Sequence, residues 1–216
     1  MSKKIGIIGT GVVGKALATG FIQAGHSVMV GSRDSGKLIQ LRSELGSSLL
    51  TGSFSDAAKF GDIVVFTVKG SVAEAALKLV GPDNLTGKVV IDTTNPIADA
   101  PPVNGVLQFF TGPNDSLMEK LQAAAPQASF VKAWSCVGSP FMINPGFPGG
   151  PPSMFICGND NSAKALVGDL LKQFGWECED MGSVEAARAI EPLCQLWCIP
   201  GLTGGRWTHA FKLLKM

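Results

Sequence analysis

The stretch KIGIIGTGVVG at residues 4–14 decides the fold. Three of its first five residues are isoleucines, which is typical of a buried strand. The next six residues form the pattern G-x-G-x-x-G, with glycines at positions 9, 11 and 14, and an apolar helical pattern follows. A strand, this glycine pattern and a helix in direct succession predict a Rossmann-type fold that binds a dinucleotide.

Each glycine of the pattern has a physical role beside a pyrophosphate. The first permits a tight turn after the strand, the second lets the backbone approach the ligand, and the third lets the helix pack closely on the strand. The first turn of the helix also offers N–H groups that have no partner within the helix. We therefore expect the dinucleotide to contact Gly9, Thr10, Gly11, Val12, Val13 and Gly14.

Apolar runs alternate with helical patterns along the first 133 residues, which predicts a series of βαβ units. The fold class that follows is α/β, with a doubly wound parallel sheet. The predicted strands are residues 4–8, 27–31, 62–68, 88–92 and 129–133. The predicted helices are residues 12–24, 35–45, 72–80 and 116–125.

The remainder of the chain is predicted to form a smaller α/β part. Two stretches, one in each part of the chain, are rich in Pro and Gly and predict long functional loops, namely residues 95–113 and 135–152. A strand at 154–157, a helix over 163–174 and a strand at 176–179 are expected to continue the series. The last helix has Pro192 within its pattern, which either kinks it or starts its second half.

We accordingly expect a dinucleotide-binding domain at 1–133 and a substrate or dimerisation part at 134–216. The apolar face of the last helix, with Leu193, Cys194 and Trp197, must cover something. It either packs onto its own domain or forms a substrate wall or a dimer interface, and a homodimer is one expectation.

The end of the second strand predicts NADP(H) rather than NAD(H). An acidic residue that would bind the ribose hydroxyls is missing there, and Gly31 is followed by Ser32 and Arg33, with Lys37 one turn later. A hydroxyl, a guanidinium and an ammonium suit the 2′-phosphate of NADP. Asp34 could be the acid at a shifted position, but Asp also favours the cap of the helix that carries Lys37.

Composition narrows the class of protein further. The 216 residues carry 18 basic and 17 acidic side chains without a basic run, so we do not expect nucleic acid as a partner. We also expect no membrane segment, and the odd number of five cysteines favours a reducing, cytoplasmic location. No metal site is predicted, because the two histidines do not form a ligand-spaced cluster with the cysteines.

In more than the G-x-G-x-x-G pattern, the chain resembles the NADP-dependent oxidoreductases related to the coenzyme F-420 (deazaflavin) reductases. The likeness is carried by residues 9–14, by Gly31-Ser-Arg-Asp34, by Ile156-Cys-Gly-Asn-Asp160 and by Arg188-Ala-Ile-Glu191-Pro-Leu193. The chain differs from that family at Lys69-Gly70 and in the loop that begins at Phe141. The resemblance implies that NADP contacts residues 10–13, Ser32, Arg33 and Lys37. It places the nicotinamide near Val68, Asn95, Pro96, Ile97, Val137, Gly138 and Ser139.

The side chains that could transfer protons are few. The chain has no tyrosine, His26 is expected in a turn away from the ligand crevice, and His209 is expected on a surface helix near the end. Lys69, at a strand end, is a weak catalytic candidate that could bind a phosphate, anchor a substrate acid or donate a proton. Cys136 is expected to line the site without reacting, because no histidine or cationic group that would activate its thiol is evident.

Three hypotheses about function follow from this inventory. The first is an oxidoreductase that transfers hydride between NADP(H) and a flavin- or deazaflavin-like acceptor, since that transfer mainly needs alignment of two rings. The second is an NADPH-dependent reductase of a small imine or carbonyl compound that uses Lys69 or an ordered water as proton source. The third is an NADP(H)-sensing protein that is not an enzyme.

Overall fold

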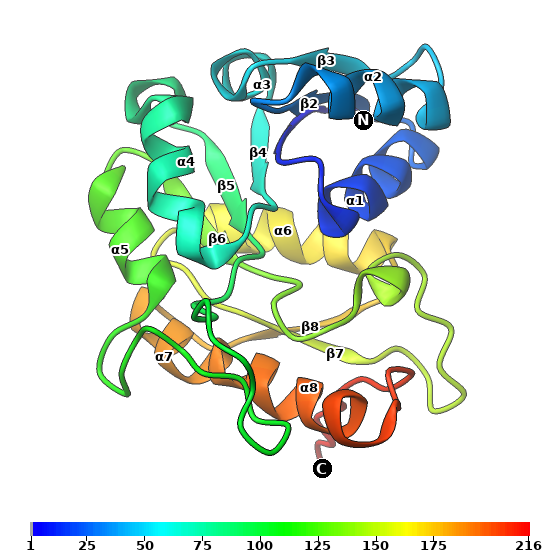
Figure 1. Ribbon diagram of the computed structural model, residues 1–216, viewed down its shortest axis with the longest axis vertical. Coiled ribbons are helices and arrows are strands. Elements are labelled where there is room, and N and C mark those ends of the chain that lie inside the picture. Colours follow the sequence, from blue (N-terminus) through cyan, green and yellow to red (C-terminus); the bar gives the residue numbers. More distant parts are fainter. Residues whose placement is uncertain (1) are drawn as a thin grey trace.

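The main element of the protein is a six-stranded parallel sheet, described here in a computed structural model of residues 2–216 (Figure 1). The strand order β3-β2-β1-β4-β5-β6 confirms the predicted doubly wound α/β fold. The order reverses between β1 and β4, which is where such sheets bind ligands, beyond the carboxyl ends of the strands. The strands are β1 (Lys4–Ile8), β2 (Ser27–Gly31), β3 (Leu50–Gly52), β4 (Ile63–Phe66), β5 (Val89–Asp92) and β6 (Ser129–Lys132).

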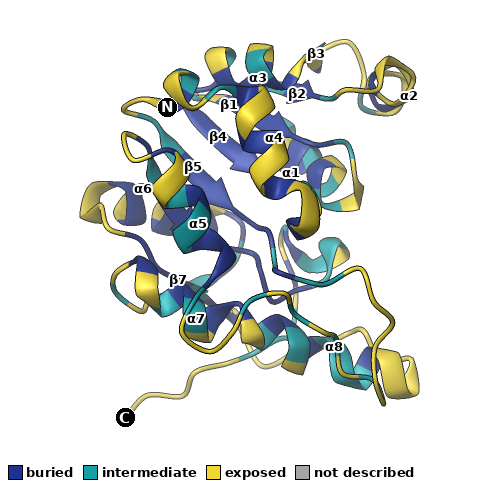
Figure 2. Cartoon of the chain, turned by 60° about the vertical axis from the view of Figure 1, so that its left-hand side comes forward, coloured by how far each residue is buried: buried dark blue, intermediate teal, exposed yellow. Residues whose placement is uncertain are grey.

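Helices cover both faces of this sheet, because its central strands are apolar on both sides. On one face, β-strand residues such as Ile7 and Val65 pack with α1 (Val12–Gln23), α2 (Ser35–Leu45) and α6 (Asn161–Gln173). On the other face, Val64 and Phe66 pack with α3 (Phe54–Phe60), α4 (Ala73–Val80) and α5 (Leu117–Ala124). Figure 2 shows the result, a buried sheet between helices whose outer sides are exposed.

One unit of the sheet is absent from the sequence prediction. The short strand β3 and the helix α3 lie in a region that the apolar pattern leaves as a connection. β3 has only three residues and is an edge strand, so it has no apolar run to reveal it. A signal for α3 was present, because Ser53 and Asp56 form a capping box, in which each side chain binds the other residue's backbone N–H.

The C-terminal part contains the predicted unit of strand, helix and strand, in a sheet of its own. β7 (Ser153–Ile156) and β8 (Glu177–Asp180) do not extend the main sheet but pair with each other in a separate parallel two-stranded sheet. A single antiparallel bridge between Lys132 and Cys157 links this pair to β6. The division at residues 133/134 stays a prediction, since one apolar cluster joins α1 to Met154 and Val167 across that boundary.

The final helical segment is broken at Glu191. A short helix α7 (Ala187–Ile190) ends there, and Pro192 occupies the first turn of α8 (Pro192–Gly204), so Pro192 starts the second half of the segment. Cys194, Trp197 and Gly201 of α8 are buried against the domain, whereas Leu196 and Leu202 are exposed. No helix within residues 2–216 is long and apolar enough to cross a membrane.

The prediction that His209 lies on a surface helix is wrong. Residues 205–216 have no helix and run back along the molecule. The His209 ring stacks on Trp197 at a centroid distance of 4.9 Å, and Trp197 Nε1 donates to the His209 carbonyl at 2.9 Å. Three glycines in the nine residues before Trp207, at 201, 204 and 205, explain why the helical pattern stops before His209.

Candidate functional site

The glycine loop between β1 and α1 has the geometry that a close ligand requires. Gly9 has a φ of +119°, which favours glycine, and its N–H donates to the Gly31 carbonyl at 3.0 Å. A Cβ on Gly14 would lie 2.3 Å from the Gly9 carbonyl oxygen, so only glycine lets α1 pack this closely. A Cβ on Gly11 would meet nothing within 4 Å, because Gly11 faces open space. Of the three glycines, Gly11 is therefore the one that leaves room for a ligand.

A cleft of about 520 Å³ opens beyond the carboxyl ends of β1, β2 and β4. It brings together eight of the residues that the sequence predicts for the site, namely Gly9, Thr10, Gly11, Ser32, Arg33, Lys37, Val68 and Lys69. Asp34, considered above as an alternative ribose ligand, also lines the cleft. Three further lining residues, Phe54, Thr67 and Val72, were not predicted. Thr67 is held in place by its hydroxyl, which donates to the Ile8 carbonyl at 2.9 Å.

Cationic groups gather at the outer end of this cleft, where β2 leads into α2. Arg33 and Lys37 are exposed and line the cleft. Asp34 is the N-cap of α2, and its carboxylate accepts from the Lys37 N–H at 3.1 Å while its own N–H donates to Ser32 Oγ at 3.0 Å. Asp34 thus has the capping role, and its carboxylate is engaged by the backbone of the helix that it caps.

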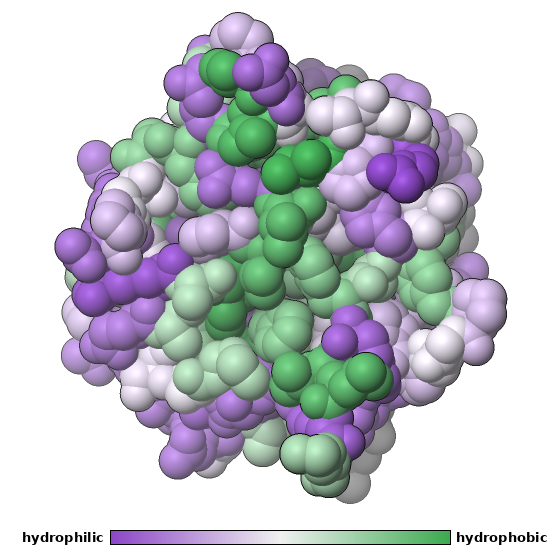
Figure 3. All heavy atoms as spheres, turned by 90° about the horizontal axis from the view of Figure 1, so that it is seen from below, coloured by the Kyte–Doolittle hydropathy of each residue, from purple (hydrophilic) through white to green (hydrophobic). Residues whose placement is uncertain are grey.

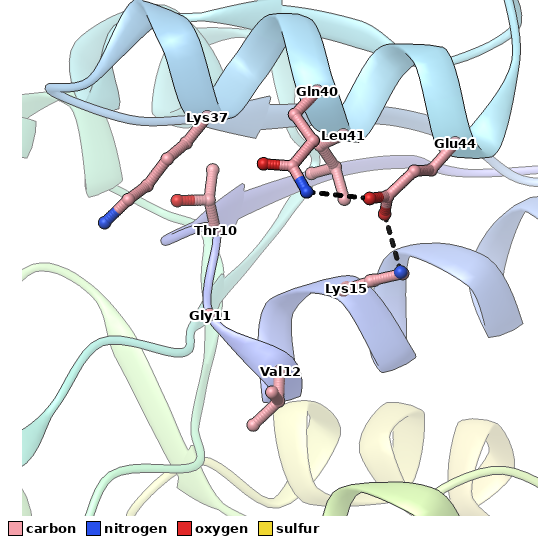
Figure 4. A pocket seen from close by; sticks show the side chains of 8 residues that line it. All are labelled: Thr10, Gly11, Val12, Lys15, Lys37, Gln40, Leu41 and Glu44. Atoms are coloured by element: carbon pink, nitrogen blue, oxygen red, sulfur yellow. Dashed lines mark hydrogen bonds and ion pairs between the residues drawn. The ribbon is translucent and has the colours of Figure 1, made fainter.

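A smaller pocket of about 240 Å³ adjoins the glycine loop on its other side (Figure 4). It contains Val12, which lies outside the larger cleft, and it shares Thr10, Gly11 and Lys37 with that cleft. Lys15 from α1 and Glu44 from α2 form an ion pair of 2.6 Å across it, which holds the two helices together. Hydrogen bonds from Lys15 and Gln40 lower the pKa of Glu44, so this carboxylate is ionised at neutral pH.

The six residues predicted to lie near the nicotinamide at 95–97 and 137–139 are in the loops after β5 and β6, outside the 520 Å³ cleft. The loop after β5 is close to Lys69-Gly70, since a Cβ on Gly70 would lie 1.8 Å from the Asn95 carbonyl oxygen. Asn95 Nδ2 in turn donates to the Ser135 carbonyl at 2.7 Å, which joins this loop to the one after β6. A Cβ on Gly138 would lie 2.9 Å from the Trp197 ring. The predicted site residues thus form one continuous edge, which runs from the glycine loop to α8.

Positions along this edge differ in exposure. Pro96 and Val137 are buried, whereas Asn95, Ile97, Gly138 and Ser139 are partly exposed. Val13 is partly buried against the core, and Gly14 is buried under the glycine loop. Neither of these two residues lines either pocket, so they support the loop from behind.

The candidate acid–base groups are placed as follows. Lys69 Nζ forms an ion pair with Asp99 at the rim of the cleft, and this pairing lowers the pKa of Asp99. His26 lies in the turn before β2, as expected, where its Nδ1 accepts from the Lys3 N–H at 3.1 Å. Cys136 is buried and lines neither pocket, and burial raises the pKa of its thiol to about 12, which does not suit a nucleophile. Among residues 2–216, no three His, Cys, Asp or Glu side chains gather closely enough to hold a metal ion.

The fit to a dinucleotide can be judged from this geometry. The space in front of Gly11 is what a pyrophosphate needs, and the exposed first turn of α1 supplies N–H donors. Ser32, Arg33 and Lys37 supply a hydroxyl and two cations where NAD-binding folds carry an acid. The residues present therefore fit a dinucleotide with an additional phosphate on its ribose.

Comparison with known proteins gives the same fold and family. Residues 4–96 match the family model described as NADP oxidoreductase, coenzyme F420-dependent. The structure of a proposed F420-dependent NADP reductase from Arthrobacter sp. FB24 superposes with a TM-score of 0.93, at 31% identity over 99% of this chain and 100% of that one.

Two curated relatives match over part of their own length. It is 30% identical to metalloreductase STEAP3 of Rattus norvegicus over 203 residues, which are 92% of this chain and 38% of the relative. It is 35% identical to the F420-dependent NADP reductase of Methanothermobacter thermautotrophicus over 105 residues, which are 45% of each. The aligned residues thus span less than half the length of either relative. From the full-length structural match and the family model together, the chain belongs to the family of coenzyme F420-dependent NADP oxidoreductases.

Proposed function

We propose that the 520 Å³ cleft binds NADP(H), and that the protein transfers hydride between this cofactor and a flat, redox-active ring of the flavin or deazaflavin type. The observation that supports NADP(H) binding is the open space at Gly11 together with the Ser32 hydroxyl and the two cations Arg33 and Lys37. When bound, the nicotinamide supplies or accepts the hydride. The residues of the chain have to bind, orient and enclose the two rings.

Phosphate recognition is divided between two strand ends. The backbone of Gly11 and the first turn of α1 face the pyrophosphate position, where N–H groups and the helix dipole favour negative charge. The Arg33 guanidinium is planar and can donate two parallel hydrogen bonds to a 2′-phosphate, with Lys37 as a second cation. Asp34 lines the same cleft, but its Oδ1 accepts from the Lys37 N–H as the cap of α2, and its Oδ2 lies 3.9 Å from Lys37 Nζ.

The ring-shaped acceptor is supported by what the edge lacks. Of the three acid–base candidates, Cys136 is buried with a raised pKa and His209 is stacked on Trp197, so only Lys69, which is engaged by Asp99, lines the cleft. Hydride transfer between two redox rings needs alignment more than proton donation. The relative from Methanothermobacter thermautotrophicus, an F420-dependent NADP reductase, supports an acceptor of this class.

An apolar surface beyond this edge gives a flat ring something to contact. Large exposed apolar side chains come from the loop after β5 and from α8 with its tail, and Gly105 lies against Thr203 where the two segments meet. They are Val103, Val106, Phe110, Leu196, Leu202 and Trp207. Figure 3, a view from below, shows a band of hydrophobic residues on this side. A surface of this kind also suits subunit contact, and the expected homodimer remains a prediction.

Replacing Arg33 tests the cofactor assignment. In Arg33→Ala, loss of a charge-assisted contact worth about 1.5–3 kcal/mol should weaken NADPH binding roughly tenfold or more, while NADH binding hardly changes. Fluorescence titration of both cofactors measures the two dissociation constants. The matched control is Arg42→Ala, because Arg42 is an exposed arginine of α2 that lines neither pocket. Equal losses for NADPH and NADH would exclude Arg33 as the 2′-phosphate ligand.

A further inference from the structure

A fully buried lysine lies under the edge that the proposed function assigns to the two rings. Lys132 is the last residue of β6, and its side chain has no exposed surface. Its Nζ lies 2.6 Å from Asp92 Oδ2, 2.8 Å from Glu191 Oε1 and 2.8 Å from the Thr94 carbonyl oxygen. Burial lowers the pKa of this lysine, but the two carboxylates outweigh burial and raise it, so Lys132 is charged. All three hydrogens of the ammonium group thus have an acceptor.

Both carboxylates are also saturated by groups of the chain itself. Asp92 Oδ1 accepts from the Thr94 N–H at 2.9 Å and from its hydroxyl at 2.7 Å. The Glu191 carboxylate accepts from the N–H groups of Leu117 and Met118, each at 3.0 Å, at the start of α5. The cluster therefore offers no free atom to a ligand, and it has excellent geometry for a buried charge group. Its role must lie in what it connects.

The segments that it connects form both ends of the proposed hydride-transfer region. Through Asp92 and the Thr94 carbonyl, Lys132 holds the start of the loop that carries Asn95, Pro96 and Ile97. Through Glu191, it holds the first residue before α8, whose Trp197 packs against Gly138. The first segment follows β5, and the second follows α7, so Lys132 joins parts of the chain that are far apart in the sequence.

The chain leaves β6 in an unusual conformation directly after this lysine. Trp134 has a φ of +55°, which is rare for a bulky side chain. Its indole Nε1 donates to the Met142 carbonyl at 3.1 Å, and its ring packs against Phe21 and Phe174. Such conformations persist only where the surroundings enforce them, and they are common near functional sites. The backbone at Ser135, which accepts from Asn95, is thus fixed from both sides.

We infer that Lys132, with Asp92 and Glu191, is a positioning residue that sets the separation between the loop at Asn95–Ile97 and helix α8. This inference rests on the proposed function, because that function places the two rings along this edge. A lysine that touches neither ring then controls how closely they approach.

The variant Lys132→Met tests the inference, with Lys164→Met as its matched control. Lys164 is also a buried lysine, paired with Asp180 at 3.0 Å, but it joins α6 to β8 and contacts none of these loops. In the cofactor-free protein, Lys132→Met should raise hydrogen exchange at residues 93–97 and 191–198 at least tenfold, with no such change in Lys164→Met. NADPH affinity should stay within about twofold of the wild type in both variants, because the phosphate-binding residues are on other strands.

With a deazaflavin or flavin acceptor, Lys132→Met should lower kcat on the order of 100-fold, since a displacement of about 1 Å can cost that much. If Lys132→Met does not fold, Thr94→Val replaces it, because this isosteric change removes only the hydroxyl contact to Asp92. That variant should show raised exchange at 93–97 and a kcat several-fold lower.

The results separate failure of this inference from failure of the proposed function. Wild-type exchange and wild-type kcat in a folded Lys132→Met or Thr94→Val variant would overturn the positioning role alone. An equal loss of kcat in Lys164→Met would mean that removing any buried lysine lowers kcat, and this result would also overturn the positioning role of Lys132. A wild-type protein that reduces no ring acceptor would overturn the proposed function, while the exchange data would still decide whether Lys132 holds the two segments.

Discussion

Gly11→Val is expected to abolish NADPH binding in a protein that still folds. The valine methyls would fill the space in front of the glycine loop, so the pyrophosphate could not reach the backbone N–H groups of α1. Two charge-assisted hydrogen bonds of about 1.5–3 kcal/mol each would be lost. This corresponds to a fall in affinity of roughly 100-fold or more. Gly11 has an extended backbone conformation with a φ of −70°, which valine adopts easily, so the unfolding temperature should change little.

Two further glycines serve as controls for this prediction. Gly14→Val should destabilise the protein by about 1–3 kcal/mol or more, because its Cβ would clash with the Gly9 carbonyl. Gly149→Val should affect neither binding nor stability, since Gly149 is exposed and has free space around it. Isothermal titration with NADPH and thermal unfolding measure the two effects. Retained NADPH affinity in folded Gly11→Val would contradict the assignment of the cleft.

The acceptor prediction has an effect of similar size. A reaction that needs a positioned proton donor loses about 10²–10⁴-fold without one. Cys136 is buried, His209 is stacked on Trp197 and Lys69 is held by Asp99 at the rim of the cleft, so we expect carbonyl and imine reduction to lack a well-positioned donor. We expect a deazaflavin, flavin or quinone to oxidise bound NADPH on the order of 100-fold faster or more than simple aldehydes, ketones or imines do. Stopped-flow absorbance of NADPH at saturating acceptor measures these rates.

Lys69→Ala distinguishes this prediction from the hypothesis of a general acid. We expect this variant to change the affinity for the acceptor more than the rate of the hydride step, since Lys69 lies at the rim of the cleft. Asp99→Asn is the matched control, because it releases Lys69 from its partner without removing the ammonium group. Faster reaction of small carbonyl or imine compounds, together with collapse of their rate in Lys69→Ala, would favour the imine or carbonyl reductase. Tight NADPH binding with no turnover of any acceptor would favour a sensor.

Much of the fold was predictable because its signals are local. The strand, the glycine pattern and the helix at residues 4–23 follow one another in sequence, and the structure has the tight turn at Gly9 and the close packing at Gly14 that the pattern predicts. The absence of an acidic residue directly after β2 could also be recognised from the sequence, because it depends only on which residue occupies that position. The edge strand β3 was missed because three residues give no period.

The unpredicted part of the site is assembled from distant segments. Phe54 lines the cleft from the start of α3, and Val72 lines it from the end of the turn before α4. Thr67 was not recognised because it falls within the strand predicted over 62–68. In the sequence, Lys132 is a polar residue near the end of a predicted strand. Its two carboxylate partners lie 40 residues before it and 59 residues after it. A buried cluster of charged side chains depends on tertiary structure, and no local sequence pattern predicts it.

A crystal structure of the protein grown with NADP⁺ tests the central claim most directly. The account predicts the pyrophosphate against Gly11 and the first turn of α1, with the 2′-phosphate beside Arg33 and Lys37. Crystals grown with NAD⁺ at the same concentration should show weaker or no density there. A nucleotide bound elsewhere on the chain, or an NADP⁺ whose 2′-phosphate lies away from Arg33, would contradict it.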